Sequence, residues 1–416
     1  MTEARPYQPS LAVWLSLAQL ITWGSTFYMF ALVMSPLERD LGVSRAESSL
    51  AFSLGLLAEG LMAYPVGRLI DRGHERLVMT LGSLLSGLCL LAHAGISSLV
   101  GLYLSWAALG ASMAATLYAP AFAVVTRRFP GHFRRAIITM TFLGGLASTV
   151  FIPLIAWLVQ GWGWRQALIV LAALQFLVCA PLHARVLRGA PRAARLAEMG
   201  AAHSPAPADV AAGGTAGGAL RRHIFSAPFG LVGLFIVLLM AVTVALPAHM
   251  VSLLRENGLS EGWAIAIPAS IGVVQVLGRL LLFFLEHRIE SHRANRLIST
   301  LVPLSLLALL AAPLSDAWRP GLLMLFVVLY GAGNGLLTIV KGTAVAQYVD
   351  RQQAASLNGA LGLPLALSRA TAPWLLGVMW SAQAGYTPGI WLLLGLSLVA
   401  LVALVLAQEL ARQRAG

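Results

Sequence analysis

Three ionisable residues, Arg279, Arg369 and Glu59, lie inside long apolar stretches of the sequence. A charge near the centre of a bilayer costs about 2.5 to 3.5 kcal/mol on insertion scales, so such residues are candidates for function. Arg279 stands eight residues before His287, about 12 Å along a helix. The planar guanidinium group binds a carboxylate through two parallel hydrogen bonds. The pair of arginines therefore favours a small organic anion as ligand over a cation or a sugar, although ion pairing between helices or snorkelling remains an alternative for each.

The elements that must position these side chains are membrane-spanning helices. The chain of 416 residues is 58% hydrophobic and 11% charged, with a mean hydropathy of +0.81, whereas soluble domains carry about 25% charged residues. Apolar stretches of about 20 residues recur from Leu11 almost to the C-terminus, and in lipid they satisfy their backbone groups as helices. We expect an all-α membrane protein with twelve transmembrane helices in two pseudo-symmetric six-helix bundles.

The predicted helices fall into two sets of six. The first set spans 11–34, 47–70, 77–97, 99–126, 136–160 and 165–187, and the second spans 224–254, 260–285, 294–314, 318–346, 354–382 and 386–408. Residues 188–223 are rich in Ala, Gly, Pro and Arg and cannot bury enough apolar surface to fold. We predict an N-terminal bundle over 1–187, a flexible cytoplasmic linker over 188–223 and a C-terminal bundle over 224–416.

An internal repeat relates the two halves. Gly42-Val-Ser44 precedes the second predicted helix, and Gly258-Leu-Ser260 precedes the eighth, at an offset of 216 residues. A pair of polar residues, Asp-Arg in one half and His-Arg in the other, closes each helix 27 residues after its serine. Ser44 and Glu47 have the spacing of a capping box. Parallel repeats of this kind are typical of transporters whose substrate site lies near the membrane midplane.

The same offset makes Gln275 the counterpart of Glu59. We interpret Glu59 as a proton-coupling group or as the counter-charge of an arginine, and a structural role in helix packing is an equally open alternative. Gln275 stands one helical turn before Arg279, and we assign it to the substrate site with Arg279 and Arg369.

The distribution of the 28 basic residues explains the net charge of +12. Most lie in the termini and loops of one side, whereas the loops of the other side carry only Arg39, Arg45, Arg165, Arg255 and Arg319. This asymmetry predicts that both termini are cytoplasmic. A nucleic-acid partner is not expected, because the basic residues form no surface interleaved with aromatic residues. Abundant Ala, Gly and Arg suggest a bacterial source and hence the inner membrane.

The segment Gly67-Arg-Leu-Ile-Asp71-Arg72-Gly73-His-Glu-Arg76 follows the second predicted helix and resembles the signature that joins helices two and three in the major facilitator superfamily. Gly73 stands one position earlier than in that signature. The resemblance implies that Gly67, Asp71, Arg72 and Arg76 control gating, with Asp71 paired to cytoplasmic arginines and to the start of helix eleven. Gly67 would also let the second helix pack closely on a neighbour.

Further motifs are similar to the monocarboxylate and oxalate/formate branch of that superfamily over the whole chain. They comprise Thr126-Arg-Arg-Phe-Pro-Gly-His-Phe-Arg-Arg135, Gly144-Gly145, Pro153 and Gly163-Trp-Arg165. In that branch one basic residue in helix eight and one in helix eleven hold a carboxylate, and Arg279 and Arg369 match these positions. The aspartate that carries a proton four residues before the helix-eight arginine is replaced here by Gln275.

We therefore expect a monomeric secondary transporter of a mono- or dicarboxylate that works by alternating access, with protons as a further partner and no cofactor. Proton-driven efflux of a drug or metabolite is the alternative. It ranks second because helix four has no arginine before Arg127, and Pro153 has no adjacent glycine. A membrane sensor without transport is an alternative from another class. An enzyme is not expected, because no catalytic or metal-binding constellation is present and Cys89 and Cys179 lie inside separate predicted helices.

Other polar and aromatic residues in the spans receive simpler interpretations. Lys341, the only lysine, lies toward the cytoplasmic end of its helix and is expected to snorkel. His93 and His249 are expected to be hydrogen-bonded core residues. The run Gly331-Ala-Gly333-Asn-Gly335 is expected to serve helix packing, and the aromatic residues expected near the pocket are Trp23, Tyr28 and Tyr118.

Overall fold

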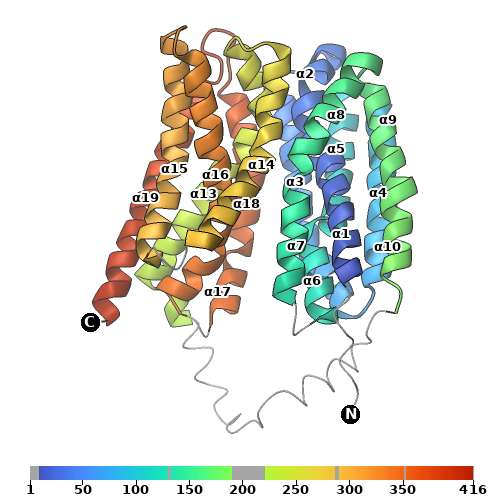
Figure 1. Cartoon of the computed structure of the whole chain (residues 1–416). Coiled ribbons are helices and arrows are strands. Elements are labelled where there is room, and N and C mark those ends of the chain that lie inside the picture. The colour runs from blue at the N-terminus through green and yellow to red at the C-terminus, as the bar shows by residue number, and fades with distance from the viewer. Residues whose placement is uncertain (1–8, 130–132, 190–220, 286–289, 351–352, 416) are drawn as a thin grey trace. The chain divides into compact units, whose positions relative to one another are not determined.

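The computed structural model describes residues 9–129, 133–189, 221–285, 290–350 and 353–415, and these residues form two compact helical units (Figure 1). The first unit comprises Met1–Ala206 and the second Pro207–Gly416. Most of the predicted linker, residues 190–220, lies outside the described residues, so its extent stays a prediction.

The N-terminal unit contains six spans, several of which are divided into shorter helical segments. They are α1 (Pro9–Thr22), a π-helix (Trp23–Tyr28) and α2 (Met29–Leu41); α3 (Arg45–Asp71); α4 (Glu75–Ala94); α5 (Leu99–Thr116) and α6 (Tyr118–Arg128); α7 (Phe133–Gly145) and α8 (Ala147–Trp162); and α9 (Trp164–Leu174), a second π-helix (Gln175–Cys179) and α10 (Ala180–Val186).

The C-terminal unit repeats this plan. Its helices are α13 (Ala227–Glu256), α14 (Glu261–Leu285), α15 (Ser291–Ala311), which a 3₁₀ turn (Ala312–Leu314) extends, α16 (Arg319–Tyr348), α17 (Ala354–Ala360), α18 (Gly362–Val378) and α19 (Thr387–Ala415). Among the described residues, eleven helices are long and apolar enough to cross a membrane. The remaining predicted span is divided at Leu361 into α17 and α18. The all-helical membrane fold is thereby confirmed.

The first helix ends at Leu41, seven residues beyond the predicted end, and the last helix extends to Ala415. The prediction was too short because it followed hydropathy, and Glu38, Arg39 and Asp40 are polar. Pro36 lies inside the helix and does not end it, as is tolerated in membrane-spanning helices.

The repeated glycine and serine positions have the predicted structural meaning. Gly42 and Gly258 have positive φ angles of 65° and 80°, the left-handed conformation that ends helices. Ser44 and Glu47 form the predicted capping box, with the Ser44 amide donating to a Glu47 carboxylate oxygen at 2.7 Å. The helices that follow begin at Arg45 and Glu261, which are 216 residues apart. The repeat is therefore a repeat of structure as well as of sequence.

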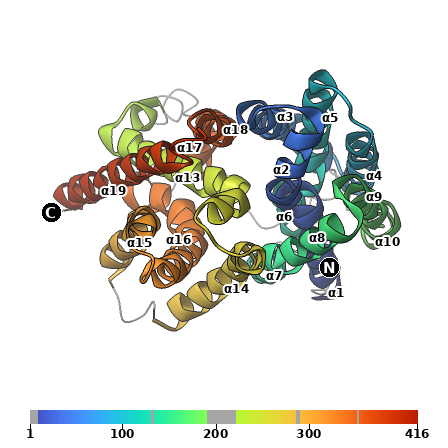
Figure 2. The ribbon, with the colours of Figure 1, turned by 90° about the horizontal axis from the view of Figure 1, so that it is seen from above.

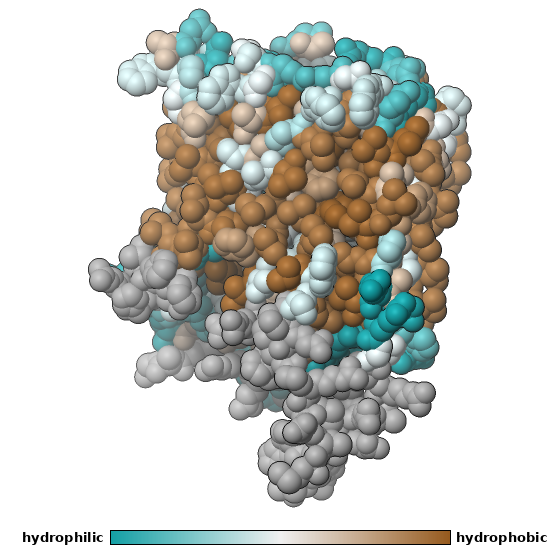
Figure 3. Space-filling view, turned by 45° about the vertical axis from the view of Figure 1, so that its right-hand side comes forward, coloured by the Kyte–Doolittle hydropathy of each residue, from teal (hydrophilic) through white to brown (hydrophobic). Residues whose placement is uncertain are grey.

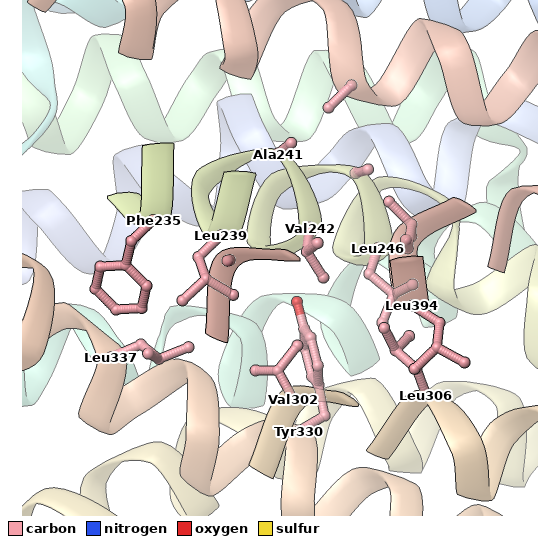
Figure 4. Packing of buried hydrophobic residues seen from close by; sticks show 14 of the residues in the cluster. Phe235, Leu239, Ala241, Val242, Leu246, Val302, Leu306, Tyr330, Leu337 and Leu394 are labelled. Atoms are coloured by element: carbon pink, nitrogen blue, oxygen red, sulfur yellow. The ribbon is translucent and has the colours of Figure 1, made fainter. Parts of the chain in front are cut away.

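Prolines inside the spans lack the N–H that would bond the carbonyl four residues earlier. Side chains from other helices donate to these carbonyls instead. Pro120 has no N–H for the carbonyl of Thr116, which accepts a hydrogen bond from Gln19 Nε2 at 2.7 Å. In the second unit, Pro247 has no N–H for the carbonyl of Thr243, which accepts a hydrogen bond from the Tyr330 hydroxyl at 3.4 Å. Figure 4 shows this hydroxyl directed from the buried core toward α13. These bonds satisfy groups that lipid could not.

Glycines allow equivalent pairs of helices in the two units to approach closely. A Cβ added to Gly110 on α5 would lie 1.9 Å from the carbonyl oxygen of Gly55 on α3. On α16, a Cβ at Gly331 would lie 2.9 Å from Val274, and one at Gly335 would lie 2.8 Å from the Gln275 Cα, both on α14. The predicted packing role of the glycine run is confirmed. Contacts of this kind are the membrane counterpart of ridges and grooves in soluble helix pairs.

The outer surface has the polarity expected of a protein in a bilayer. Figure 3 shows a band of hydrophobic residues between hydrophilic ends on the face in view. Large apolar side chains along the helices are exposed, among them Leu104 at 67% and Leu177 at 76%. A soluble protein rarely exposes so continuous an apolar surface.

Gly110→Ala is expected to destabilise the N-terminal unit by about 1–3 kcal/mol or more, because the backbone of α3 occupies the space of the added methyl group. Gly161→Ala is the matched control, since a Cβ at Gly161 on α8 meets nothing within 4 Å. Thermal unfolding of the purified protein in detergent measures both. Equal melting temperatures for the two variants would contradict the packing argument.

Candidate functional site

Gln275 and Arg279 lie one turn apart on α14, where this helix packs on α16. Both are half-buried. The Arg279 Nε donates to the carbonyl oxygen of Gly335 at 3.1 Å, and the absence of a side chain at Gly335 brings its backbone against Gln275. The two residues assigned from the sequence to one site therefore gather around one glycine of α16.

Arg369 lies half-buried on α18, which is attached to α13 on both sides of the arginine. Ser368 donates to the carbonyl oxygen of Val237 at 2.8 Å. The carbonyl oxygen of Pro373 accepts a hydrogen bond from His249 Nε2 at 3.0 Å, and the other ring nitrogen of His249 lies 3.0 Å from the Tyr386 hydroxyl. His249 is thus the hydrogen-bonded core residue that was predicted. Figure 2 shows α13 between α14 and α18.

Lys341 extends the set of cations beyond the residues that the sequence assigned to the site. It is half-buried on α16, six residues after Gly335. Among the described residues, none forms a hydrogen bond or an ion pair with its ammonium group. The sequence could have indicated Lys341 by its uniqueness and by its place in an apolar span.

The helices that carry the three cations contain no acidic residue in their interiors. The sequence has no Asp or Glu between Glu261 and Glu286, and none between Asp316 and Asp350. The same holds from Asp350 to Glu409, which includes all of α18. A low-dielectric interior makes such an excess of positive charge costly unless an anion balances it. The arrangement is suited to binding a small anion.

Glu59 lies half-buried on α3, one turn after Gly55, in the N-terminal unit. Its counterpart Gln275 occupies the equivalent helix of the other unit. The proton-coupling role of Glu59 stays a prediction.

The segment predicted to control gating has the helix-ending geometry of a Schellman motif. Gly73, with φ of 91°, donates to the carbonyl oxygen of Ile70, and His74 donates to that of Leu69. Gly73, which stands one position earlier than in the family signature, therefore still provides the left-handed residue that ends α3. Asp71 and Arg72 are exposed, and Asp71 has no ion pair in the described part of the N-terminal unit.

Gly67 and Arg76, the other two motif residues, have different surroundings from each other. A Cβ at Gly67 would meet nothing within 4 Å, and the close packing of this helix on a neighbour at Gly67 stays a prediction. Arg76 donates through Nε to the carbonyl oxygen of Ala184 on α10 at 2.7 Å.

Glu75, which the sequence analysis did not single out, is the buried carboxylate of this region. It is 0% exposed and lies against Arg128 Nε and, at 3.7 Å, Arg127 Nη1 at the end of α6. Arg128 also donates to the carbonyl oxygen of Leu187 at 2.8 Å. The cluster joins the start of α4 to the ends of α6 and α10. Its signal in the sequence was that it is one of two acidic residues, with Asp71, in a motif that contains three arginines.

The three aromatic residues predicted near a pocket form one group in the N-terminal unit. The Trp23 ring lies 5.2 Å from that of Tyr118 and 6.5 Å from that of Tyr28. A π-helix at Trp23–Tyr28 places two of them on adjoining turns, and such segments often occur at functional sites. All three are half-buried.

A hollow in the described part of the C-terminal unit contains none of the predicted site residues. It has a volume of about 600 Å³ and lies at the ends of helices, where Trp380 Nε1 donates to Glu256 at 2.9 Å. Its walls include Arg319, Tyr386 and Ile390.

Comparisons with known proteins agree with this architecture. The sequence model described as "Major Facilitator Superfamily" matches residues 15–318. Monocarboxylate transporter 13 of Bos taurus is 27% identical over 372 residues, which cover 82% of each chain, and that of Rattus norvegicus is 26% identical over 372 residues, which cover 82% of this chain and 81% of the relative.

Solved structures share the fold at low sequence identity. The nucleoside transporter NupG has a TM-score of 0.72 at 16% identity, covering 96% of this chain and 99% of that one. A bacterial homologue of the human lysosomal transporter Spinster has a TM-score of 0.72 at 18% identity, covering 99% and 98%.

Glu75→Gln is expected to lower the free energy of unfolding by about 3–5 kcal/mol, because Arg127 and Arg128 lose a buried counter-charge. Denaturant or thermal unfolding in detergent measures the change. Asp71→Asn, which alters an exposed carboxylate of the same motif, should stay within about 0.5 kcal/mol of the parent. If Asp71→Asn were as damaging as Glu75→Gln, the assignment of Glu75 as the buried centre would be wrong.

Proposed function

The chain belongs to the Major Facilitator Superfamily, and on this premise we propose that it carries a small organic anion, a mono- or dicarboxylate, by alternating access. Family membership makes it a multi-pass membrane transporter and not an enzyme. The proposal concerns the substrate, the residues that bind it and the coupling.

One observation carries the choice of an anion. Arg279 and Arg369 lie half-buried on α14 and α18 of one unit, on helices whose interiors contain no acidic residue. A carboxylate would accept charge-assisted hydrogen bonds from these guanidinium groups with opposite charges on donor and acceptor, which a neutral sugar or a cation does not offer. The name of the monocarboxylate transporters that the chain resembles agrees with this substrate class.

Local attachments support a preorganised site. Gly335 holds Arg279 through its carbonyl oxygen, and two hydrogen bonds fasten the helix of Arg369 to α13. Fixed donors bind an anion more tightly than mobile ones, because less conformational entropy is lost on binding. Gln275 adds a neutral amide beside Arg279.

The remaining predicted residues take part in coupling and gating. Glu59 is the one carboxylate in the middle of a span, and we assign it to proton coupling. Gly67, Asp71, Arg72 and Arg76 form the gate at the end of α3. The excess of arginines on one side favours cytoplasmic termini, and the abundance of Ala, Gly and Arg favours a bacterial inner membrane. We propose that the protein acts as a monomer.

Arg279→Ala and Arg369→Ala are each expected to reduce carboxylate counterflow in proteoliposomes by at least about tenfold, because each removes a charge-assisted contact. Arg293→Ala serves as the control, since the Arg293 side chain is 83% exposed in the same unit. If both site variants carried every carboxylate as fast as the parent, an anion substrate bound by these arginines would be excluded.

Glu59→Gln is expected to abolish the acceleration of uptake by an imposed pH gradient while leaving counterflow at equal pH intact. The amide keeps the size of the side chain but cannot bind and release a proton at these pH values. Uptake of labelled carboxylate with and without the gradient measures this. Unchanged acceleration in the variant would remove Glu59 from the coupling mechanism.

A further inference from the structure

We propose that the N-terminal unit binds one anionic phospholipid between the start of α4 and the end of α10. The site is a hollow with a volume of about 400 Å³. It contains none of the residues assigned to substrate binding or coupling, so the inference goes beyond the proposed function. It rests only on membership of a family of membrane transporters, whose spans are surrounded by lipid. The lining residues that carry the inference are His74, Arg76, Leu77, Thr80, Ala184 and Leu187.

The hollow lies at the level where two spans end. The candidate membrane spans Glu75–Ala94 and Trp164–Val186 begin and end, respectively, beside it. Figure 1 shows these ends of α4 and α10 side by side, and Arg76 Nε joins them by donating to the carbonyl oxygen of Ala184 at 2.7 Å. Lipid phosphates lie where spans leave the hydrocarbon core of a bilayer. The hollow is therefore at the height of the lipid headgroups.

Arg76 supplies the positive charge of this hollow. Its side chain is exposed, and the bond from Nε to Ala184 fixes its guanidinium group. Among the described residues, none accepts a hydrogen bond from its two Nη atoms, and no acidic side chain lines the hollow. A guanidinium group with available N–H groups donates charge-assisted hydrogen bonds to a phosphate. The chemistry of the hollow thus favours an anionic phosphate group.

Thr80, one turn after Arg76, adds a hydroxyl group to the lining. Its oxygen is buried and has no hydrogen-bond partner in the part of the chain that the structure describes. Other hydroxyl groups in the spans of this unit, such as those of Ser16 and Thr26, donate to the carbonyl oxygen one turn earlier. A buried hydroxyl without a partner costs free energy, which a phosphate oxygen that accepted its hydrogen bond would recover.

An apolar stripe on α4 leads away from the hollow and fits an acyl chain. Leu77, Leu81, Leu85 and Leu88 follow each other at the spacing of one helix face, and all four are exposed. From Leu77 to Leu88 the helix rises about 16 Å, close to the depth of one leaflet in a hydrocarbon core of about 30 Å. A headgroup at Arg76 and an acyl chain along this stripe fit one molecule, which favours a phospholipid over free phosphate.

Lipid binding to the purified protein in detergent tests the inference. Native mass spectrometry measures the affinities for phosphatidylglycerol and phosphatidylcholine with the same acyl chains. Phosphatidylglycerol should bind about fivefold more tightly, because no choline offsets the charge of its phosphate. Arg76→Gln should weaken phosphatidylglycerol binding by about fivefold and leave phosphatidylcholine binding within about twofold of the parent. Arg76→Lys, which keeps the charge, should retain most of the affinity.

Arg185→Gln is the matched control. Arg185 is an exposed arginine of α10 that does not line the hollow, so its replacement should change the affinity by less than about twofold. Because Arg76→Gln also removes the bond to Ala184, Thr80→Val provides a second test that leaves this bond in place. Thr80→Val should weaken phosphatidylglycerol binding by about threefold or more. Melting temperatures without lipid show whether each variant is folded.

Four results would overturn the inference. Equal affinities of the parent for both lipids would show that the headgroup charge is not recognised. Equal losses in Arg76→Gln and Arg185→Gln would reduce the effect to the general charge of this surface. Unchanged binding in both Arg76→Gln and Thr80→Val would remove the hollow from lipid binding. Displacement of the lipid by an equal concentration of glycerol phosphate would identify a site for a free phosphate. None of these measurements involves a transported substrate, so the proposed function is tested separately.

Discussion

The cost of holding positive charge away from water is the constraint on which the C-terminal unit depends. Each cation in a span costs about 2.5 to 3.5 kcal/mol on insertion scales, and three of them lie on helices without interior acids. Hydrogen bonds fix the backbone around two of these cations, Arg279 and Arg369. Gly335 accepts from Arg279, and α18 is bonded to α13 on both sides of Arg369. Hydrogen bonds therefore fix Arg279 and the stretch of α18 that carries Arg369.

The need to hydrogen-bond every backbone N–H and C=O group constrains the rest of both units. Helices in lipid must pair every N–H and C=O, and prolines make this impossible by backbone bonds alone. The solutions are side chains from distant helices, such as Gln19 at the Thr116 carbonyl and Tyr330 at the Thr243 carbonyl. Each solution joins two helices that are far apart in sequence. The prolines that weaken single helices therefore strengthen the contacts between them.

Local sequence patterns predicted the spans, the repeat and the two arginines, because apolar length, cap residues and buried charge are visible in one segment at a time. Gly42 and Ser44 indicated a helix boundary, because glycine readily adopts a positive φ angle and serine readily caps the start of a helix. Glu75 could not be identified in this way. Its burial depends on Arg127 and Arg128, which come from a helix more than 50 residues later.

The division of the eleventh span at Leu361 has a mechanical consequence. Pro364 removes the N–H that would have bonded the carbonyl of Ala360, so α17 and α18 are joined without a continuous hydrogen-bond ladder. Only α18 carries the bonds from Ser368 and Pro373 to α13. A change in the tilt of α17 would therefore be absorbed at the joint, while Arg369 kept its place on α13. Such a span can bend at α17 without moving the part of α18 that is bonded to α13.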